Sequence, residues 1–263
     1  MDPIVQSDQY TDYYVPGTPL VNQKQFTCYY SRGDEGLNAV LETYSNGYRW
    51  NLVRSWDNDT GGTAEYTVRY TTEFRVRTGY SLETSWNIGF QYKGMSVGIG
   101  GGNKTFREDE TTTTTMHEQK ITIPPRSKLF FYQKVYRFDV KVWFILDAWN
   151  ELSRVGGRWN YKPSVVTGSI EIHSDDYYTR DVELRYGSTT TTAEEVQPVV
   201  RFKWTRMFEN CTERCKRYLL NHGVDPPRAL EAGLEADSSE KLPDEAEDDG
   251  GKPCAAVIPF SDW

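Results

Sequence analysis

A strict alternation of apolar and polar residues runs without a break from Tyr66 to Tyr92. The even-numbered positions are apolar, aromatic or threonine, whereas odd-numbered neighbours such as Arg69, Glu73 and Asn87 are polar. A period of two residues is typical of β-strands. Strands usually have about 5 to 6 residues, so we expect this run to be bent or interrupted in the soluble protein.

A second alternating run follows Lys93-Gly94, with its apolar positions now at odd numbers such as Val97 and Ile99. The change of parity predicts a tight turn with one arm on each side, residues 82–92 and 95–106. A tilted strand needs roughly 9 to 11 residues to cross a bilayer. The pattern therefore suits a hairpin on the surface of a β-protein or a hairpin that enters a membrane. Insertion would require several chains in a closed barrel, because hydrocarbon does not tolerate unpaired strand edges.

Helical spacing is clearest just before the C-terminal part of the chain and predicts an amphipathic helix over residues 204–223. A shorter helix is predicted over residues 35–43. Four cysteines are disulfide candidates, and their spacing fits no zinc signature, so no metal site is expected. These cysteines are Cys28, Cys211, Cys215 and Cys254.

Composition supports a mainly β protein, since 14% of the residues are aromatic and threonine and valine are frequent. The formal net charge of -8 arises in residues 225–263, which hold eleven acids and three bases. With four prolines and no aromatic residue between Asp225 and Pro253, this stretch is typical of a flexible acidic tail. It is either a solubilising tail or a removable cap, whose candidate cleavage sites are Arg228, Lys241 and Lys252.

Little in the sequence favours catalysis. The three histidines stand in different contexts, and no nucleophile elbow, phosphate loop or metal-ligand spacing accompanies them. The acidic trio Glu108-Asp109-Glu110 favours a solvated turn over a calcium site, and Asp175-Asp176 with its following tyrosines favours a turn. We expect a protein that is not an enzyme, has no cofactor and, without a basic stripe, binds no nucleic acid.

Location is only partly defined by the sequence. No stretch is long and apolar enough for a membrane helix, and the first residues lack the pattern of a secretory signal. We therefore expect a soluble form that is secreted or cytosolic.

The N-terminal third is rich in aromatic residues mixed with Asp, Asn and Gly. Aromatic rings stack on sugars and lie well at membrane interfaces, so this part is a candidate receptor-binding region. Core packing explains many of the same residues equally well. The candidates for receptor contact are Tyr13, Tyr14, Tyr29, Tyr30 and Trp56.

The order of these features resembles the aerolysin-like β-pore-forming proteins, which include epsilon-toxin, mosquitocidal toxins and eukaryotic cytotoxin-like relatives. The resemblance rests on the long Thr- and aromatic-rich strand, the Gly/Ser-rich hairpin, the threonine run and "QKITIPPRSKLFFYQKVYRFDVKVWF", and spans residues 66–200. The piece "ITIPPRSKL" is similar to the strand-Pro-Pro turn that follows the family's insertion loop. The resemblance to this family implies an elongated fold of long, twisted antiparallel strands with an amphipathic insertion hairpin, residues 81–106, and one or two short helices.

The resemblance also implies a mode of action. Such a protein binds a glycan or protein receptor on a cell surface, assembles with copies of itself into a homo-oligomeric ring and inserts its hairpins into the lipid membrane of the target cell, in many members after proteolytic activation. The residues expected to face lipid are Trp86, Ile88, Phe90, Tyr92, Met95, Val97 and Ile99. The residues expected to face the pore lumen are Ser85, Asn87, Gln91 and Ser96.

The expected organisation is four consecutive segments. Residues 1–62 form an aromatic-rich head, 63–203 the pore-forming β module, 204–223 the amphipathic helix and 224–263 the acidic tail. The expected function is that of a β-barrel pore-forming toxin or defence cytolysin. The alternative is a soluble β-rich glycan- or ligand-binding protein that shares the fold and does not insert.

Overall fold

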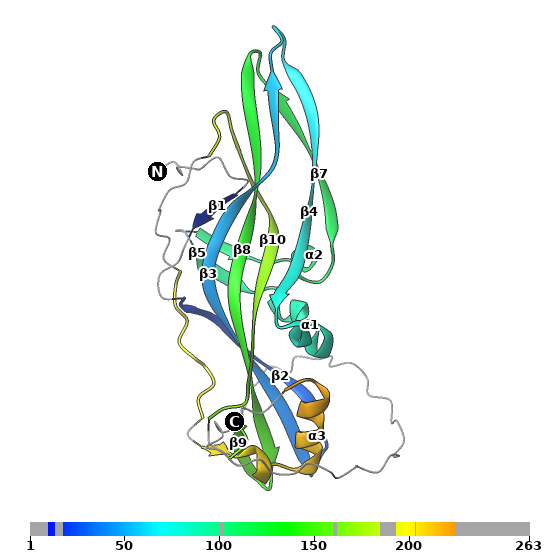
Figure 1. Ribbon diagram of the computed structural model, residues 1–263, viewed down its shortest axis with the longest axis vertical. Helices are drawn as coiled ribbons and strands as arrows, with labels where there is room; N and C mark the ends of the chain where they lie inside the picture. Colours follow the sequence, from blue (N-terminus) through cyan, green and yellow to red (C-terminus); the bar gives the residue numbers. More distant parts are fainter. Residues whose placement is uncertain are drawn as a thin grey trace, which may run out of the picture. The chain divides into compact units, whose positions relative to one another are not determined.

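The computed structural model describes residues 10–13, 18–99, 102–159, 162–184, 193–202 and 204–224 (Figure 1). Long antiparallel strands dominate these residues, and the helices among them are short. The predicted mainly β class is therefore confirmed. Among the described residues, no helix has the length and apolar character needed to cross a membrane.

The chain divides into two compact units that interleave along the sequence. Unit 1 comprises residues 1–24, 41–142 and 166–200, and unit 2 comprises residues 25–40, 143–165 and 201–263. This division differs from the four consecutive segments expected from the sequence. The aromatic-rich N-terminal third is not a unit of its own, because its residues are shared between the two.

Unit 1 is built on strands that pair in the order β1-β3-β8-β10-β4-β7. The pairs β1–β3, β10–β4 and β4–β7 are antiparallel, and β4 pairs with β7 from Ala64↔Ile123 to Thr72↔Thr115. Phe131, Val135 and Phe138 of β8 are completely buried, so this strand supplies much of the core. The strands are β1 (Tyr10–Tyr13), β3 (Glu35–Asn58), β4 (Ala64–Thr78), β7 (Thr115–Ile123), β8 (Ser127–Ala148) and β10 (Val165–Arg180).

Unit 2 contains short strands and the best-formed helix. The end of β8 pairs with β9 (Glu151–Val155) in an antiparallel hairpin, and β9 pairs in parallel with β11 (Thr205–Arg206). Strand β2 (Leu20–Tyr30), whose second half belongs to this unit, pairs with β3. The short η2 (Phe208–Asn210) leads into the helix α3 (Glu213–Asn221).

Two helix predictions are corrected here. The amphipathic helix expected over residues 204–223 covers only α3, since the preceding residues form β11 and η2. The helix expected over residues 35–43 is the beginning of β3. Leu37, Leu41 and Val40 are all fully buried, and a strand buried on both faces shows the same apolar spacing as a helix.

The long alternating run from Tyr66 is interrupted after Thr78, as expected for the unbound protein. Gly79 has φ +82, a left-handed conformation that favours glycine. A Cβ at this position would lie 2.8 Å from the carbonyl oxygen of Thr167. The chain therefore leaves the sheet at Gly79, and the second half of the predicted strand is free to adopt another structure.

Candidate functional site

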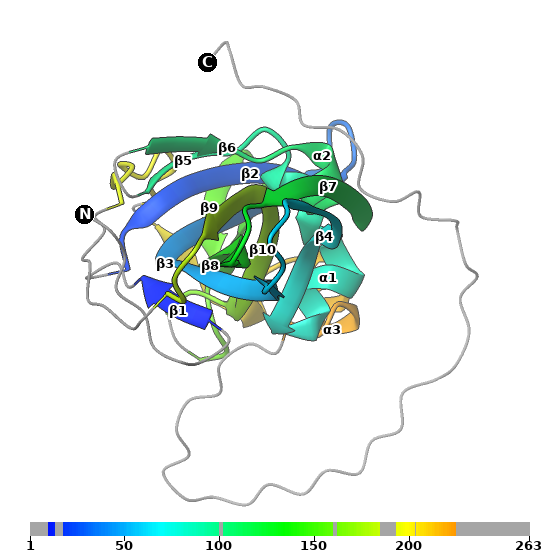
Figure 2. The same cartoon turned by 90° about the horizontal axis from the view of Figure 1, so that it is seen from above.

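The residues between β4 and β7 form the candidate functional site, and we call residues 79–111 the switch segment. Figure 2 shows β5, β6 and α2 of this segment on the same side of β8. Phe106 contacts Tyr136 and Phe138 of β8 with ring centroids 5.1 and 5.9 Å apart. The segment consists of α1 (Tyr80–Trp86), η1 (Ile88–Tyr92), β5 (Ser96–Ile99), β6 (Gly102–Thr105) and α2 (Glu108–Thr111).

The predicted turn at Lys93-Gly94 is present, but the predicted arms are not paired with each other. Met95 N donates to the carbonyl of Tyr92 at 3.0 Å, and Gly94 has φ +76, as in a type II turn. Residues 82–92 are helical instead of extended, while Ser96–Ile99 pairs with Gly102–Thr105. The hairpin expected over 81–106 is therefore replaced here by two helical pieces and a shorter ladder.

Burial divides the predicted lipid-facing residues from the predicted lumen-facing ones. Six of the seven predicted lipid-facing side chains are buried, with exposed fractions from 0% to 6%; Phe90, at 50%, is the exception. The six are Trp86, Ile88, Tyr92, Met95, Val97 and Ile99. Of the residues expected to face the lumen, Asn87 and Ser96 are exposed, and Ser85 and Gln91 are half-buried.

The same apolar positions satisfy two different periods. Leu82 and Trp86 are four residues apart, as are Ile88 and Tyr92, and all four are buried. A spacing of four places residues on one face of a helix, whereas even-numbered positions lie on one face of a strand. The sequence of the switch segment can therefore bury the same side chains as a helix or as a strand.

Helix α1 has weak local support. Gly79 and Asn87 flank it in left-handed conformations, and no side chain caps its N-terminus. Its seven residues include threonine, tyrosine and tryptophan, which favour strands. Isolated helices this short are marginal in water, so burial of Leu82 and Trp86 in the body of unit 1 must hold α1 in place.

A polar cluster around the buried Glu110 ties the end of the switch segment to β10. Glu110 is completely buried and accepts hydrogen bonds from the backbone N–H of Arg107 at 2.8 Å and of Asp175 at 3.0 Å. Lys104 Nζ lies 2.9 Å from Glu110 and 2.6 Å from the carboxylate of Asp175. A guanidinium nitrogen of Arg107 lies 2.6 Å from the other oxygen of Asp175. We call Lys104, Arg107, Glu110 and Asp175 the clasp.

Burial and pairing shift the clasp pKa values in opposite directions. Burial raises the pKa of Glu110, although its two backbone hydrogen bonds and Lys104 oppose the shift. Burial alone would also raise the pKa of Asp175, but its contact with Lys104 outweighs this and lowers it. Burial would lower the pKa of Lys104, and its hydrogen bonds to the two carboxylates raise it instead. The cluster thus depends on each charge having its partner.

Aromatic contacts complete the anchoring. The hydroxyl of Tyr92 lies 3.1 Å from that of Thr43 on β3, and its ring contacts Phe74 and Phe138. Burial raises the pKa of Tyr92. A Cβ at Gly89 would collide with the carbonyl oxygen of Thr111, so glycine allows η1 and α2 to pack closely.

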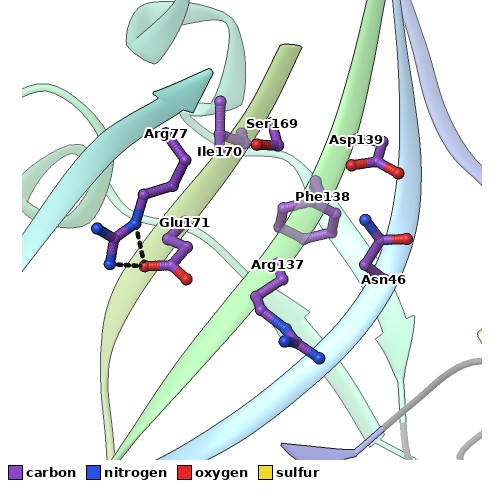
Figure 3. A pocket seen from close by; sticks show the side chains of 8 residues that line it. All are labelled: Asn46, Arg77, Arg137, Phe138, Asp139, Ser169, Ile170 and Glu171. Carbon is purple, nitrogen blue, oxygen red and sulfur yellow. Dashed lines mark hydrogen bonds and ion pairs between the residues drawn. The ribbon is translucent and has the colours of Figure 1, made fainter.

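A cavity of 380 Å³ lies beside the start of the switch segment (Figure 3). Arg77 donates to Glu171, which also pairs with Arg49 at 3.2 Å. These ion pairs, with the His173 ring 3.8 Å from the Glu171 carboxylate, outweigh burial and lower the pKa of Glu171 to about 2. The cavity thus has walls of mixed charge around a structural ion pair. Its lining is Asn46, Arg77, Arg137, Phe138, Asp139, Ser169, Ile170 and Glu171.

The candidate receptor residues do not fall in one unit. Trp56 belongs to unit 1, where its ring lies 5.9 Å from that of Tyr66. Tyr29 and Tyr30 belong to unit 2; Tyr29 packs against Tyr218 at 5.3 Å and donates to Glu35 at 3.1 Å, whereas Tyr30 is 67% exposed. Tyr14 and the side chain of Tyr13 lie outside the described residues.

The cysteines and the tail complete the sequence-based candidates. Cys28, Cys211 and Cys215 are buried thiols, so these three candidates do not form a disulfide with one another in the structure. Cys254 and the candidate cleavage sites Arg228, Lys241 and Lys252 lie outside the described residues. No metal-binding group of His, Cys, Asp or Glu occurs among the residues that the structure describes.

Sequence reasoning missed the clasp. The acidic trio was expected to form a solvated turn, but Glu110 is buried at the end of α2. Asp175 and Asp176, expected in a turn, lie within β10. The sequence offered one signal, the bases Lys104 and Arg107 next to the acidic trio. The partner of Glu110 on β10, Asp175, is 65 residues away, so the local sequence does not reveal it.

Comparison with known proteins gives a likeness in structure and none in sequence. No family model matches the sequence, and no curated protein matches it. Among solved structures, the chain is similar to the crystal structure of the oligomeric pore-forming toxin pro-Monalysin, with a TM-score of 0.33 and 12% sequence identity. The match covers 64% of this chain and 71% of that chain. We therefore base the function on the residues of this chain.

Proposed function

We propose that this protein forms membrane pores, in which the switch segment leaves unit 1, becomes an extended hairpin and joins those of other copies in a closed β-barrel. The observation that carries the proposal is the mismatch between the hydrophobic pattern of residues 80–92, which is that of a strand, and their helical conformation in the structure. Residues 80–92 have the two-residue period of a membrane strand but are folded into helical pieces, with Trp86, Ile88 and Tyr92 buried.

The energetics are compatible with such a change. Burying one large apolar side chain stabilises a fold by roughly 1.5–3 kcal/mol, and the switch segment buries several of them. A bilayer would keep the same faces away from water, so the apolar contribution lost on release is recovered on insertion. Pairing between neighbouring hairpins would satisfy the backbone N–H and C=O groups, which is the condition for strands in hydrocarbon.

The pore lumen would be lined near its tip by uncharged polar residues. Ser85, Asn87, Gln91 and Ser96 alternate with the apolar positions. Because these side chains carry no charge, we expect weak ion selectivity in this part of the pore.

Phe90 and Asn87 offer a matched pair of variants. Both side chains are exposed in the structure, so an aspartate at either position should leave the fold intact. Asn87 has φ +43, a conformation that aspartate also tolerates. In the barrel, however, residue 90 would face lipid, where an aspartate costs about 2 kcal/mol per subunit, while residue 87 would face water.

The test is dye release from liposomes of cell-derived lipids, with the chain intact and truncated after Val224. We expect release by the wild type, strongly reduced release by Phe90→Asp, and full release by Asn87→Asp with a shift toward cation selectivity. Thermal unfolding of both variants verifies the fold. Release that requires truncation would identify the tail as a cap. Absence of release from receptor-bearing membranes in every form would favour the binding protein that does not insert.

A further inference from the structure

Unit 2 exposes three tryptophans next to basic residues. Trp149, Trp159 and Trp204 have 55%, 72% and 71% of their surface exposed, and Leu152 has 57%. Trp149 stands at the turn between β8 and β9, and Trp204 directly precedes β11. The backbone N–H of Arg154 on β9 donates to the carbonyl of Trp204 at 3.2 Å, so both tryptophans flank the same small ladder.

Backbone strain marks two of these tryptophans. Trp149 has φ +56 and the next residue, Asn150, has φ +59; Trp159 also has φ +59. A two-residue turn with both φ values positive normally contains asparagine, aspartate or glycine, and a bulky residue there is an outlier. Strain of this kind costs about 1–3 kcal/mol and is concentrated at functional sites.

The charge of this region is opposite to that of the chain as a whole. Residues 143–165 and 201–212 hold six bases and three acids, whereas the whole chain has a formal net charge of -8. Two of the acids have partners in the structure: Glu151 lies 2.7 Å from Arg206, and Glu209 accepts from the backbone N–H of Trp159 at 3.1 Å. Arg206 also lies over the ring of Trp149, 4.6 Å from its centroid.

We propose that the exposed side chains of Trp149, Leu152, Trp159 and Trp204 dock unit 2 on anionic phospholipid membranes. Tryptophan prefers the headgroup level of a bilayer, and each arginine or lysine near an anionic leaflet contributes favourably to binding. An anionic lipid surface satisfies both the exposed rings and the excess positive charge. This inference rests on the proposed function, because a pore former must reach a bilayer before it inserts.

Binding is measured by co-sedimentation of the full chain with vesicles of phosphatidylcholine alone and of phosphatidylcholine with 30% phosphatidylserine. The test variants are Trp149→Gly, which also relieves the positive-φ strain, and Trp204→Ala. The matched control is Met116→Ala, which removes a 64% exposed apolar side chain from unit 1. We expect the double variant, which carries both Trp149→Gly and Trp204→Ala, to bind anionic vesicles at least tenfold more weakly than the wild type. The control should bind normally, and high salt should weaken wild-type binding.

Unchanged binding by the double variant would overturn the docking surface, as would equal binding to neutral vesicles or complete competition by free sugars. Thermal unfolding separates the proposal from misfolding, since Trp149→Gly should be at least as stable as the wild type. Phe90→Asp separates it from the proposed function: this variant should still sediment with anionic vesicles while losing dye release. If the double variant keeps both full vesicle binding and dye release, the docking proposal is refuted and the proposed pore formation is not.

Discussion

Helices α1 and α3 are of similar length but are stabilised in different ways. In α3, the side chain of Thr212 caps the N-terminus by accepting from Cys215 N at 3.1 Å, and Gly223, with φ +72, follows the end of the helix. Its buried residues Cys215 and Leu219 follow a helical spacing. Helix α1 has no side-chain cap and a strand-like sequence. In most proteins the local sequence favours the conformation that the fold requires. The sequence of α1 favours a strand instead, which is typical of a segment with a functional role.

Truncation of a buried leucine in each helix should have the largest effect. Leu82 of α1 and Leu219 of α3 are both fully buried, and Leu→Ala at such sites typically costs about 2–5 kcal/mol. We expect Leu82→Ala to speed hydrogen exchange in residues 80–106 without affecting α3, and Leu219→Ala to do the reverse. Equal exchange changes in both regions after either substitution would contradict the separate anchoring of α1.

Acid should weaken unit 1 through Glu171. Its pKa is lowered from 4.5 to about 2 by Arg77, Arg49 and His173, so its contribution to stability is complete above its ordinary pKa and is lost as the pH falls toward 2. We expect a loss of about 2–3 kcal/mol over this range. Urea unfolding at pH 3 and pH 7 measures it. Glu171→Gln should lower stability at pH 7 and flatten the pH dependence; an unchanged difference would exclude Glu171 as its source.

Substitutions that act mainly through the local stability of a helix should have the smallest effects, with opposite signs. Thr212→Ala removes the cap of α3 and should cost about 1 kcal/mol. Thr84→Ala replaces an exposed strand-former in α1 and should stabilise that helix by about 0.5 kcal/mol. If the proposed function holds, the second variant should also release dye more slowly. Thermal unfolding and initial leakage rates measure both effects, and faster leakage by Thr84→Ala would contradict the helix-to-strand conversion.

Much of unit 1 could be predicted from the sequence. The alternation before Thr78 and around Ile121–Ile123 corresponds to β4 and β7, and the parity change at Lys93-Gly94 correctly located a turn. Periodicity failed for residues 80–92 because their apolar positions suit a helix as well as a strand. The segment's actual conformation is decided by burial against β4 and β8, which no local pattern reveals.

The clasp and the exposed tryptophans of unit 2 were not predicted from the sequence, for a different reason. Glu110 meets Asp175 only after β10 is placed beside β4, so its burial depends on contacts distant in sequence. Exposed tryptophans resemble core residues in a sequence, and only the positive φ angles and exposure of Trp149 and Trp159 separate them from the core.

The β5–β6 ladder has a consequence for the speed of action. Strand β5 already has partners, since four residue pairs join Ser96–Ile99 to Gly102–Thr105. A hairpin folded about Lys93-Gly94 would place Ser96 opposite Gln91 instead, so these pairs must break before new ones form. On the proposed function, this exchange imposes an activation barrier with a large enthalpy, so its rate falls steeply as the temperature falls. At low temperature, membrane-bound protein should therefore persist as a long-lived precursor that has not inserted. On warming, many copies should insert at the same time.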